Sequence, residues 1–536
     1  MNFVCRRQTS WLMALVLSFV LFIPQVAAAQ VTAFKQAVAE AAASDRDIAA
    51  FYQANGYQPI WTGNSNRDKQ RRQQFLRAVS QAGDHGLPEG RYSPEIIETN
   101  IRRVKSERDL GRLEVELSRL FLLYARDIQT GIVTPSRVDE QIVREVPLRS
   151  RTGLLAAFAK SSPAGFIKAL PPKSGEYNNL MKEKIRLEKV LGSGGWGPQV
   201  RAKKLEKGQG GEAVVVLRNR LIRMGYLRRS SSAVYDDAIV QAVAQFQRDN
   251  GLTPDGVAGE ATIAEINAQV ETRLAQVMVA MERERWLNSP GGRGDRHVWV
   301  NLTDFRTKLY DKGKVTFETR SVIGERKLDK RSPEFSDMME YMEINPDWTV
   351  PRSILGRDYL PKLKQNPYAA QYLQLIDVRG RVVSRDEIDF SQYNERNFPF
   401  TVRQPPGRAN ALGTVKFMFP NPYAIYLHDT PARNLFQREV RAYSSGCIRL
   451  MDPHDFAYIL LKRQMKDPEP YFQSILKSGK QTIVPLDEAV PVHIVYRTAF
   501  TEPKKNLQFR RDVYGRDAKI WAAMQNAGVA LRAVRG

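Results

Sequence analysis

Cysteine is nearly absent from this sequence, which has two in 536 residues, Cys5 and Cys447. Cys5 lies in the N-terminal leader described next, so we expect the mature chain to keep Cys447 alone. A chain with one cysteine has no internal disulfide, and this excludes a small disulfide-stabilised scaffold. The Cys447 thiol is therefore either buried and inert or retained for its reactivity.

Strongly apolar sequence is concentrated at the N-terminus. Arg6 and Arg7 precede the run WLMALVLSFVLFIPQVAAA, and small residues lie just before Gln30. This arrangement is typical of a secretory signal with an A-x-A cleavage site, here over residues 1–29. An uncleaved membrane anchor is the alternative, although the run is barely long enough to span a bilayer. In both cases we expect the rest of the chain to be exported.

Acidic residues are scarce relative to basic ones, with 58 Asp and Glu against 81 Lys and Arg, a formal charge of +23. A basic balance spread along the chain attracts polyanions such as nucleic acid, anionic lipid head groups or a cell wall rich in carboxylates. Export and the absence of any nucleic-acid-binding signature exclude nucleic acid as the natural partner.

The length predicts several folded units, because single hydrophobic cores stop growing near about 300 residues. Apolar residues at helical spacing, such as Leu113, Leu117 and Tyr124, indicate a helical scaffold over residues 30–200 with no catalytic chemistry of its own. The charged, glycine-rich stretch RAKKLEKGQGGE then predicts a linker at 201–212.

Residues 213–270 have the pattern of three short helices, with a turn at TPDGVAG between the last two. The stretch LRNRLIRMGYL…YDDAIVQAVAQFQRDNGLTPDGVAGEATI resembles the small three-helix peptidoglycan-binding module. No cluster of titratable residues suits catalysis here, so a binding role is expected. A spacer that no longer touches glycan is the alternative.

Strand patterns follow a connecting helix at 271–295. HVWVNLTDFRTKLYD, KVTFETRSVIGE and MMEYMEINPDWTV alternate polar and apolar residues, and DKGK predicts a hairpin turn between the first two. We expect a mostly-β domain over 296–500 and a C-terminal extension over 501–536. The long segment at about 355–399 is either a lid over a site or a loosely ordered insertion.

A nucleophilic cysteine needs a nearby base, or a positive field that lowers the thiol pKa. Among five histidines, His428 is distinct because it ends the apolar strand AIYLH, from which the chain could fold back to Cys447. The other four lie in less suggestive places: His85, His297, His454 and His493. The helix after SSGCIRLMDP is expected to be capped by Asp452.

The residues around Cys447 also suit acyl chemistry. Gly446 permits a tight turn and an oxyanion hole of main-chain N–H groups, Ser444 and Ser445 can brace that turn, and Arg449 supplies positive charge. Each feature alone also fits a buried cysteine, a surface histidine or an ordinary loop. Together they favour a cysteine acyltransferase or hydrolase. Ligands at metal spacing are lacking, so we expect neither metal nor cofactor.

The stretch YLHDTP…YSSGCIRL is similar to the signature of the L,D-transpeptidases, the YkuD-type catalytic domain: histidine, a short spacer, then S-x-G-C-x-R. VNLTDFRTKLY, INPDWTVP, RQPPG, NALGTVKFMFPN and PVHIVYRTAF resemble the large periplasmic YcbB-type branch of that family. Many smaller members carry histidine where this chain has Ser445, so a role for a second histidine cannot be transferred.

The resemblance implies a multidomain α+β protein of the periplasm: a helical scaffold, the three-helix module and a mostly-β catalytic domain with an inserted cap. It implies a Cys447 nucleophile that attacks diaminopimelate in a stem tetrapeptide and releases D-alanine, with His428 as general base and acid. The remaining expected contributors are an oxyanion hole at Gly446 and Cys447 with Ser445 in its turn, substrate contact or support from Arg449, Ser444 and Tyr426, and the Asp429 carbonyl on the His428 ring.

The partners implied are peptidoglycan stem peptides and glycan, with a monomer expected and inhibition by carbapenems. An outer-membrane protein could instead supply the acceptor amine. Three alternatives stay open: an L,D-carboxypeptidase, a stem-trimming cysteine peptidase and a noncatalytic wall-binding scaffold.

Overall fold

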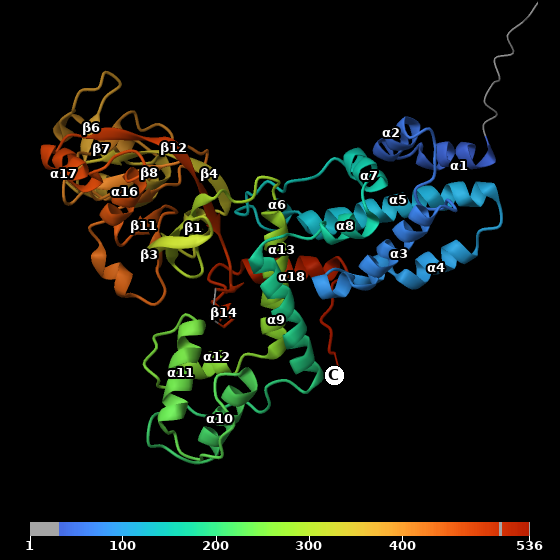
Figure 1. The fold of residues 1–536 in the computed structure, drawn as a ribbon. Coiled ribbons are helices and arrows are strands. Elements are labelled where there is room, and N and C mark those ends of the chain that lie inside the picture. Colours follow the sequence, from blue (N-terminus) through green and yellow to red (C-terminus); the bar gives the residue numbers. More distant parts are fainter. Residues whose placement is uncertain (1–31, 503–505, 535–536) are drawn as a thin grey trace, which may run out of the picture.

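The computed structural model describes residues 32–502 and 506–534, and it confirms the expected multidomain α+β fold. Figure 1 shows a helical region, a three-helix module and a mostly-β domain arranged around the upright helix α13. The predicted signal and Cys5 lie outside the described residues. Within residues 32–502 and 506–534, helices long and apolar enough to cross a membrane are absent.

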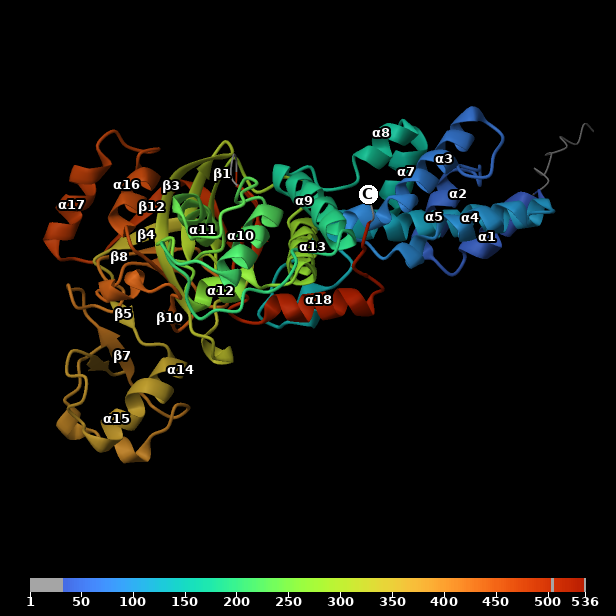
Figure 2. The same cartoon turned by 90° about the horizontal axis from the view of Figure 1, so that it is seen from below.

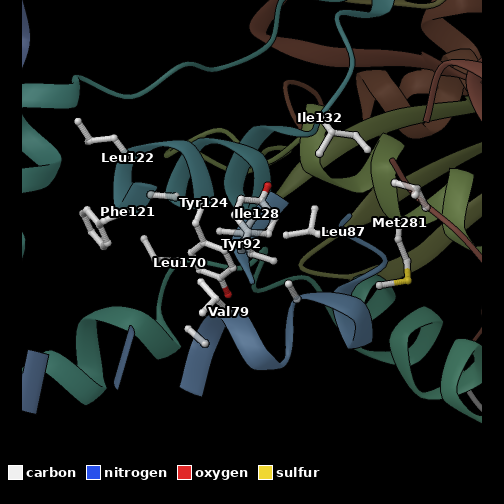
Figure 3. Packing of buried hydrophobic residues seen from close by; sticks show 14 of the residues in the cluster. Val79, Leu87, Tyr92, Phe121, Leu122, Tyr124, Ile128, Ile132, Leu170 and Met281 are labelled. Atoms are coloured by element: carbon white, nitrogen blue, oxygen red, sulfur yellow. The ribbon is translucent and has the colours of Figure 1, made fainter. Parts of the chain in front are cut away.

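The N-terminal region is an assembly of helices around the long helix α5. Leu117, Phe121, Tyr124 and Ile128 of α5 are buried, and Figure 3 shows Tyr124 and Ile128 beside Tyr92 from the short helical turn before α4. The helices are α1 (Ala33–Ala42), α2 (Arg46–Ala54), α3 (Asn66–Ser80), α4 (Pro94–Arg102), α5 (Glu107–Thr130), α6 (Pro135–Val138), α7 (Arg151–Lys160), α8 (Pro163–Lys168) and α9 (Gly175–Gly192).

A buried carboxylate on α5 fixes the loop between α2 and α3. Glu114 accepts hydrogen bonds from the main-chain N–H groups of Ile60 at 2.7 Å and Thr62 at 2.8 Å, and from the Tyr52 hydroxyl at 2.8 Å. Burial raises the pKa of Glu114. These bonds compensate for removing the carboxyl group from water, since an unsatisfied buried polar group is costly.

The three helices expected in the module are present: α10 (Glu212–Met224), α11 (Asp237–Asp249) and α12 (Glu260–Ile266). Helix α10 ends at Gly225, whose φ of +87° suits glycine at a helix C-terminus. The Gln247 side chain accepts from Gly256 N–H at 2.8 Å and donates to the Val257 carbonyl at 2.9 Å, which holds the predicted turn in place.

Helix α13 (Val270–Trp286) joins the parts of the molecule through buried ion pairs. Its Arg283 lies between Glu334 of the β domain and Asp517 of the C-terminal helix α18 (Arg516–Asn526). Its Glu284 pairs with Arg497 at 2.7 Å. The C-terminal extension therefore folds back onto the centre of the molecule, beside α13 in Figure 1.

The β domain is one nine-stranded sheet in the order β10-β3-β11-β9-β8-β4-β12-β1-β2, and an additional β2–β3 pairing closes it on itself. Helices α16 (Pro453–Leu461) and α17 (Pro468–Ser478) pack on it. Its strands are β1 (Arg296–Asn301), β2 (Arg306–Asp311), β3 (Lys314–Gly324), β4 (Phe335–Ile344), β8 (Val415–Met418), β9 (Leu427–His428), β10 (Ala442–Ser444), β11 (Ile448–Leu450) and β12 (Thr482–Val495).

Two local expectations need correction. HVWVNLTDFRTKLYD forms two strands, because the chain turns between Asn301 and Arg306 with Phe305 at a φ of +53°. Asp452 precedes α16, but its side chain makes no capping bond. It accepts instead from the Thr319 hydroxyl at 2.7 Å, so it ties the helix start to β3.

The inserted segment is a folded cap with its own apolar core, including Leu355, Leu363, Phe390 and Val402. That core runs from Trp348 to Leu412, which is wider than the expected 355–399. The cap contains β5 (Trp348–Thr349), α14 (Arg352–Ile354), the π-helix Leu355–Tyr359, α15 (Leu360–Gln365), β6 (Gln374–Ile376) and β7 (Thr401–Gln404). Figure 2 shows it projecting from the β domain, far from α1–α5.

Candidate active site around Cys447

Strand register brings the predicted site residues together. Strands β9 and β11 are parallel neighbours, with Arg449 beside His428, and the N–H of Ile448 donates to the Tyr426 carbonyl at 3.1 Å. Because side chains alternate along a strand, Tyr426, His428, Cys447 and Arg449 share one face. With strands about 4.8 Å apart and a rise of about 3.3 Å per residue, a regular ladder puts the backbones of Cys447 and His428 about 8 Å apart. Their side chains can close that gap.

The Cys447 thiol is half-buried, and its Sγ donates to the Ala424 carbonyl at 3.5 Å. Burial raises the pKa of Cys447 to about 11, against the smaller opposing effects of hydrogen bonds from Tyr426 and the charge of Arg449. This differs from the lowered thiol pKa expected for a nucleophilic cysteine beside a base or a positive charge. Desolvation outweighs the positive field, so the resting thiol is protonated.

His428 is 4% exposed, and its Nδ1 lies 2.5 Å from the Asp429 carbonyl oxygen, the hydrogen bond expected from the sequence. A carbonyl only accepts, so the ring proton is on Nδ1 and Nε2 keeps its lone pair. Burial, followed by the charge of Arg449, lowers the pKa of His428 to about 3. The imidazole is therefore neutral at physiological pH, as a general base must be.

The turn before Cys447 requires glycine. Gly446 has a φ of +128°, and a Cβ at this position would lie 3.1 Å from Ile425 Cδ1. Ser444 braces the turn, because its Oγ accepts from Gly446 N–H at 3.1 Å and donates to the Cys447 carbonyl at 2.6 Å. Ser332, which the sequence did not single out, donates to the Gly446 carbonyl at 2.6 Å.

The two N–H groups expected to form an oxyanion hole, those of Gly446 and Cys447, differ in whether they already donate a hydrogen bond. That of Gly446 is occupied by Ser444, whereas that of Cys447 donates to no group in the described part of the chain. Arg449 is half-buried and, among residues 32–502 and 506–534, has no ion pair or hydrogen-bond partner for its guanidinium. Burial lowers the pKa of Arg449. One main-chain donor and one cation are thus open to a ligand beside the thiol.

The cap reaches the turn before Cys447 through Arg357, a residue of its π-helix. The guanidinium donates to Ser445 Oγ at 3.3 Å and pairs with Asp329 at 3.0 Å. π-helical turns are rare and frequent at functional sites. Arg357 could not be found from sequence, because nothing in RSILGRDY links it to a residue 88 positions away.

Other contributors lie behind and beside His428. Lys416 of β8 is its cross-strand partner on the other side and pairs with Glu343 at 3.0 Å. The Asp429 carboxylate accepts from both the N–H and the hydroxyl of Thr414 at 2.9 Å. Thr414 and Lys416 alternate in GTVKF, a signal that could have placed them near His428 once β8–β9 pairing was assumed.

The remaining histidines serve elsewhere. His85 contacts the Tyr177 hydroxyl at 3.0 Å in the helical region, and His493 lies between Ser336 and the Arg293 carbonyl. His297 stacks on Tyr310. His454 contacts the Thr414 hydroxyl at 2.7 Å, one layer behind Asp429.

Comparison with protein families agrees with this arrangement. Residues 295–468, which contain the whole Cys447 site, match the model of the L,D-transpeptidase catalytic domain. The chain contains a YkuD-type L,D-transpeptidase domain. Residues 210–266 match a putative peptidoglycan binding domain, and residues 46–183 match a scaffold domain.

A putative L,D-transpeptidase of Haemophilus influenzae (strain ATCC 51907 / DSM 11121 / KW20 / Rd) is 32% identical over 299 residues. The match covers 55% of this chain and 58% of that relative, so it spans little more than half of either protein. Solved L,D-transpeptidase structures from Xylanimonas cellulosilytica DSM 15894 and Stackebrandtia nassauensis are 13% and 14% identical. Each covers 56% of this chain and 98% or 97% of its own, with TM-scores of 0.17 and 0.21.

Proposed function

We propose that this protein is a peptidoglycan L,D-transpeptidase that crosslinks two stem peptides through an acyl-enzyme on Cys447. The observation that carries the proposal is the shared face of β9 and β11 within the L,D-transpeptidase domain. A thiol, a neutral imidazole and an unpaired guanidinium lie together there. Peptidoglycan as the substrate is supported by the matches to the L,D-transpeptidase and peptidoglycan-binding domains.

In the first half-reaction, the Cys447 sulfur attacks the carbonyl carbon of diaminopimelate, the third residue of a tetrapeptide stem. His428 Nε2 takes the thiol proton as the carbon–sulfur bond forms, and then gives it to the leaving amine. The amide bond to the terminal D-alanine breaks, and D-alanine departs. Because both groups rest neutral, proton transfer accompanies attack instead of preceding it.

In the second half-reaction, the side-chain amine of diaminopimelate on another stem attacks the thioester. His428 takes a proton from this amine, the carbon–sulfur bond breaks, and Cys447 recovers its proton. The product is an amide between two third residues. Water as the acceptor would make the enzyme an L,D-carboxypeptidase, and an amine on an outer-membrane protein would attach that protein to the wall.

The charge that develops on the carbonyl oxygen needs donors. The unpaired N–H of Cys447 is the first, and Gly446 N–H becomes a second if Ser444 Oγ gives up its bond. Arg449 is suited to a stem carboxylate or to the developing negative charge, since a guanidinium binds carboxylates through paired N–H groups. Tyr426 hydrogen bonds to the thiol and orients it.

The peptidoglycan-binding module and the cap both suit an enzyme whose substrate is a polymer. A wall-binding module raises the local concentration of stems without adding contacts at the thiol. The cap, tied to Ser445 by Arg357, limits water near the thioester and so favours an amine as acceptor. The periplasm, entered through the N-terminal signal, is the compartment in which this substrate occurs.

The test combines intact-protein mass and product mass. Incubation with disaccharide tetrapeptide should add the donor minus D-alanine to the wild type and add nothing to Cys447→Ala. His428→Gln should form the adduct at least about a hundredfold more slowly, the usual range for losing a general base. A carbapenem should add its own mass at Cys447. A wall-binding scaffold would acquire no adduct, and a peptidase would give hydrolysed stems alone even with acceptor in excess.

A further inference from the structure

A large cleft separates the peptidoglycan-binding module from the catalytic sheet. Its volume is about 1090 Å³, and its walls come from the end of α11, the turn between β1 and β2, the segment 437–441 before β10, and the C-terminal segment. Figure 1 shows α11 facing β3 across this region. None of the residues assigned to the Cys447 site lines it.

The cleft is basic, with eight arginines and five acidic residues on its walls. The acidic residues are already engaged. Asp304 pairs with Arg510 at 2.5 Å, Glu439 with Arg511 at 3.0 Å and Glu318 with Arg306. Asp249 accepts from Gln508 at 2.8 Å, and Glu502 pairs with Lys308 at 2.5 Å.

Several arginines, by contrast, keep free charge. Arg326 and Arg438 are exposed, and within the described residues their guanidinium groups make no ion pair or hydrogen bond. Arg441 is buried, and within the described residues it donates only to main-chain carbonyls, those of Arg438 at 2.8 Å, Phe305 at 3.1 Å, Ser321 at 3.2 Å and Glu439 at 3.5 Å. Burial and the charges of Arg306 and Arg320 lower the pKa of Arg441 to about 10, so it stays protonated at neutral pH.

Two segments of the cleft wall, at Arg441 and Arg326, adjoin the turn before Cys447. Arg441 immediately precedes β10, which ends at Ser444, and the N–H of Glu325 donates to the Ser444 carbonyl at 2.9 Å. Arg326 therefore lies at the start of the loop 325–331, and Asp329 of the same loop contacts Arg357 of the cap. The loop 325–331 thus contacts the cap through Asp329 and lines the cleft through Arg326.

We propose that this cleft binds the carboxylates of the acceptor stem peptide, carried on a strand held by the module, and guides its amine to Cys447. The inference rests on the proposed function and names the second substrate's binding site. Unpaired arginines along a groove attract carboxylates and raise their local concentration. Peptidoglycan stems carry carboxylates along their length, as such a site requires.

The test uses the full-length enzyme with a charge-reversed double variant, Arg326→Glu with Arg438→Glu. At acceptor concentrations below saturation, the ratio of crosslinked to hydrolysed product should fall about tenfold, the scale expected when two exposed charge contacts are reversed. Lys477→Glu makes the same kind of change on α17, at an exposed lysine outside the cleft, and should leave the ratio unchanged.

A chemically modified acceptor separates carboxylate binding from other causes. Amidation of the acceptor carboxylates should lower the wild-type ratio to the level of the neutral pair Arg326→Gln with Arg438→Gln, and should raise the ratio of the charge-reversed variant, because amidation removes its repulsion. Equal ratios for the wild type and the double variant with native acceptor would overturn the inference. So would an equal response of both enzymes to amidation.

Two controls make every result decisive. Thermal unfolding shows whether each variant folds. If the charge-reversed variant does not fold, the neutral pair Arg326→Gln with Arg438→Gln replaces it. This neutral pair should lower the ratio of crosslinked to hydrolysed product in the same direction, but by less. A wild-type enzyme that forms no acyl-enzyme would contradict the proposed function itself. An acyl-enzyme with an unaltered product ratio in the variants contradicts only the cleft.

Discussion

At the scale of single residues, burial and the charge of Arg449 together set the pKa values of Cys447 and His428. The pKa of Cys447 rises to about 11 and that of His428 falls to about 3, so both groups are neutral over the whole physiological range. Burial is the leading cause in each case. At Cys447 burial outweighs the charge of Arg449, which favours the thiolate, whereas at His428 that charge acts in the same direction as burial and disfavours the imidazolium. In the resting state Cys447 is therefore a protonated thiol and His428 a neutral imidazole.

This balance predicts the pH dependence of alkylation. Because the thiol pKa is raised to about 11, the iodoacetamide rate at Cys447 should increase about tenfold per pH unit from 7 to 10, with no plateau near neutrality. Intact mass follows the reaction at a single cysteine. Arg449→Gln should lower the rate at each pH, since it removes a charge that stabilises the thiolate. A plateau between pH 5 and 7 would indicate a thiolate–imidazolium pair and contradict this assignment.

Which residues lie together around Cys447 could be predicted from the sequence better than their pKa values. Cys447, His428 and the Asp429 carbonyl were identifiable because the motif and the strand-end histidine are local patterns. The raised thiol pKa was not, since burial depends on chain segments distant in sequence. Arg357 and Ser332 escaped notice for the same reason: each contacts the turn from a segment whose own sequence carries no signal.

At the scale of elements, α5 shows how one buried group organises a loop. Glu114→Gln keeps the shape but replaces one acceptor oxygen by a donor that faces main-chain N–H groups. We expect a loss of about 3 kcal/mol in the free energy of unfolding of the helical region, in the range for unsatisfied buried partners. Chemical denaturation followed by circular dichroism measures it. Glu116→Gln, exposed on the same helix, should change stability by less than about 0.5 kcal/mol.

The cap contacts the turn before Cys447 through the side chain of Arg357, so one substitution can test this contact. Arg357→Ala removes the contacts with Ser445 and Asp329 while leaving the cap core intact. Since the cap limits water at the thioester in the proposed mechanism, the share of hydrolysed product should rise several-fold at fixed acceptor. Arg379→Ala, on an exposed part of the cap, is the matched control. An unchanged product ratio in Arg357→Ala would mean that the cap does not exclude water through this contact.

At the scale of the whole molecule, the domains are held by buried charged groups that local sequence patterns do not pair. The helix ending MERERW was expected as a simple connection. In the structure its Arg283 lies between Glu334 and Asp517, and its Glu284 between Arg293 and Arg497. Periodicity predicted each domain, because it reports on local burial. Arrangement of the domains depends on pairs more than fifty residues apart, for which one sequence gives no signal.

The stability of the protein should depend on pH through His493, a buried histidine where β4 and β12 pair. His493 is held between Ser336 and the Arg293 carbonyl, and burial lowers its pKa to about 3 from an ordinary 6.5. The unfolded chain therefore binds a proton that the folded chain does not between pH 6.5 and 3. The stabilisation is complete above pH 6.5 and is lost as the pH falls, by about 2 kcal/mol between pH 6.5 and 5. Thermal unfolding should show a shallower acid dependence in His493→Gln than in the wild type. Parallel melting curves for the two proteins across this range would show that His493 stays exposed to protons in the folded state.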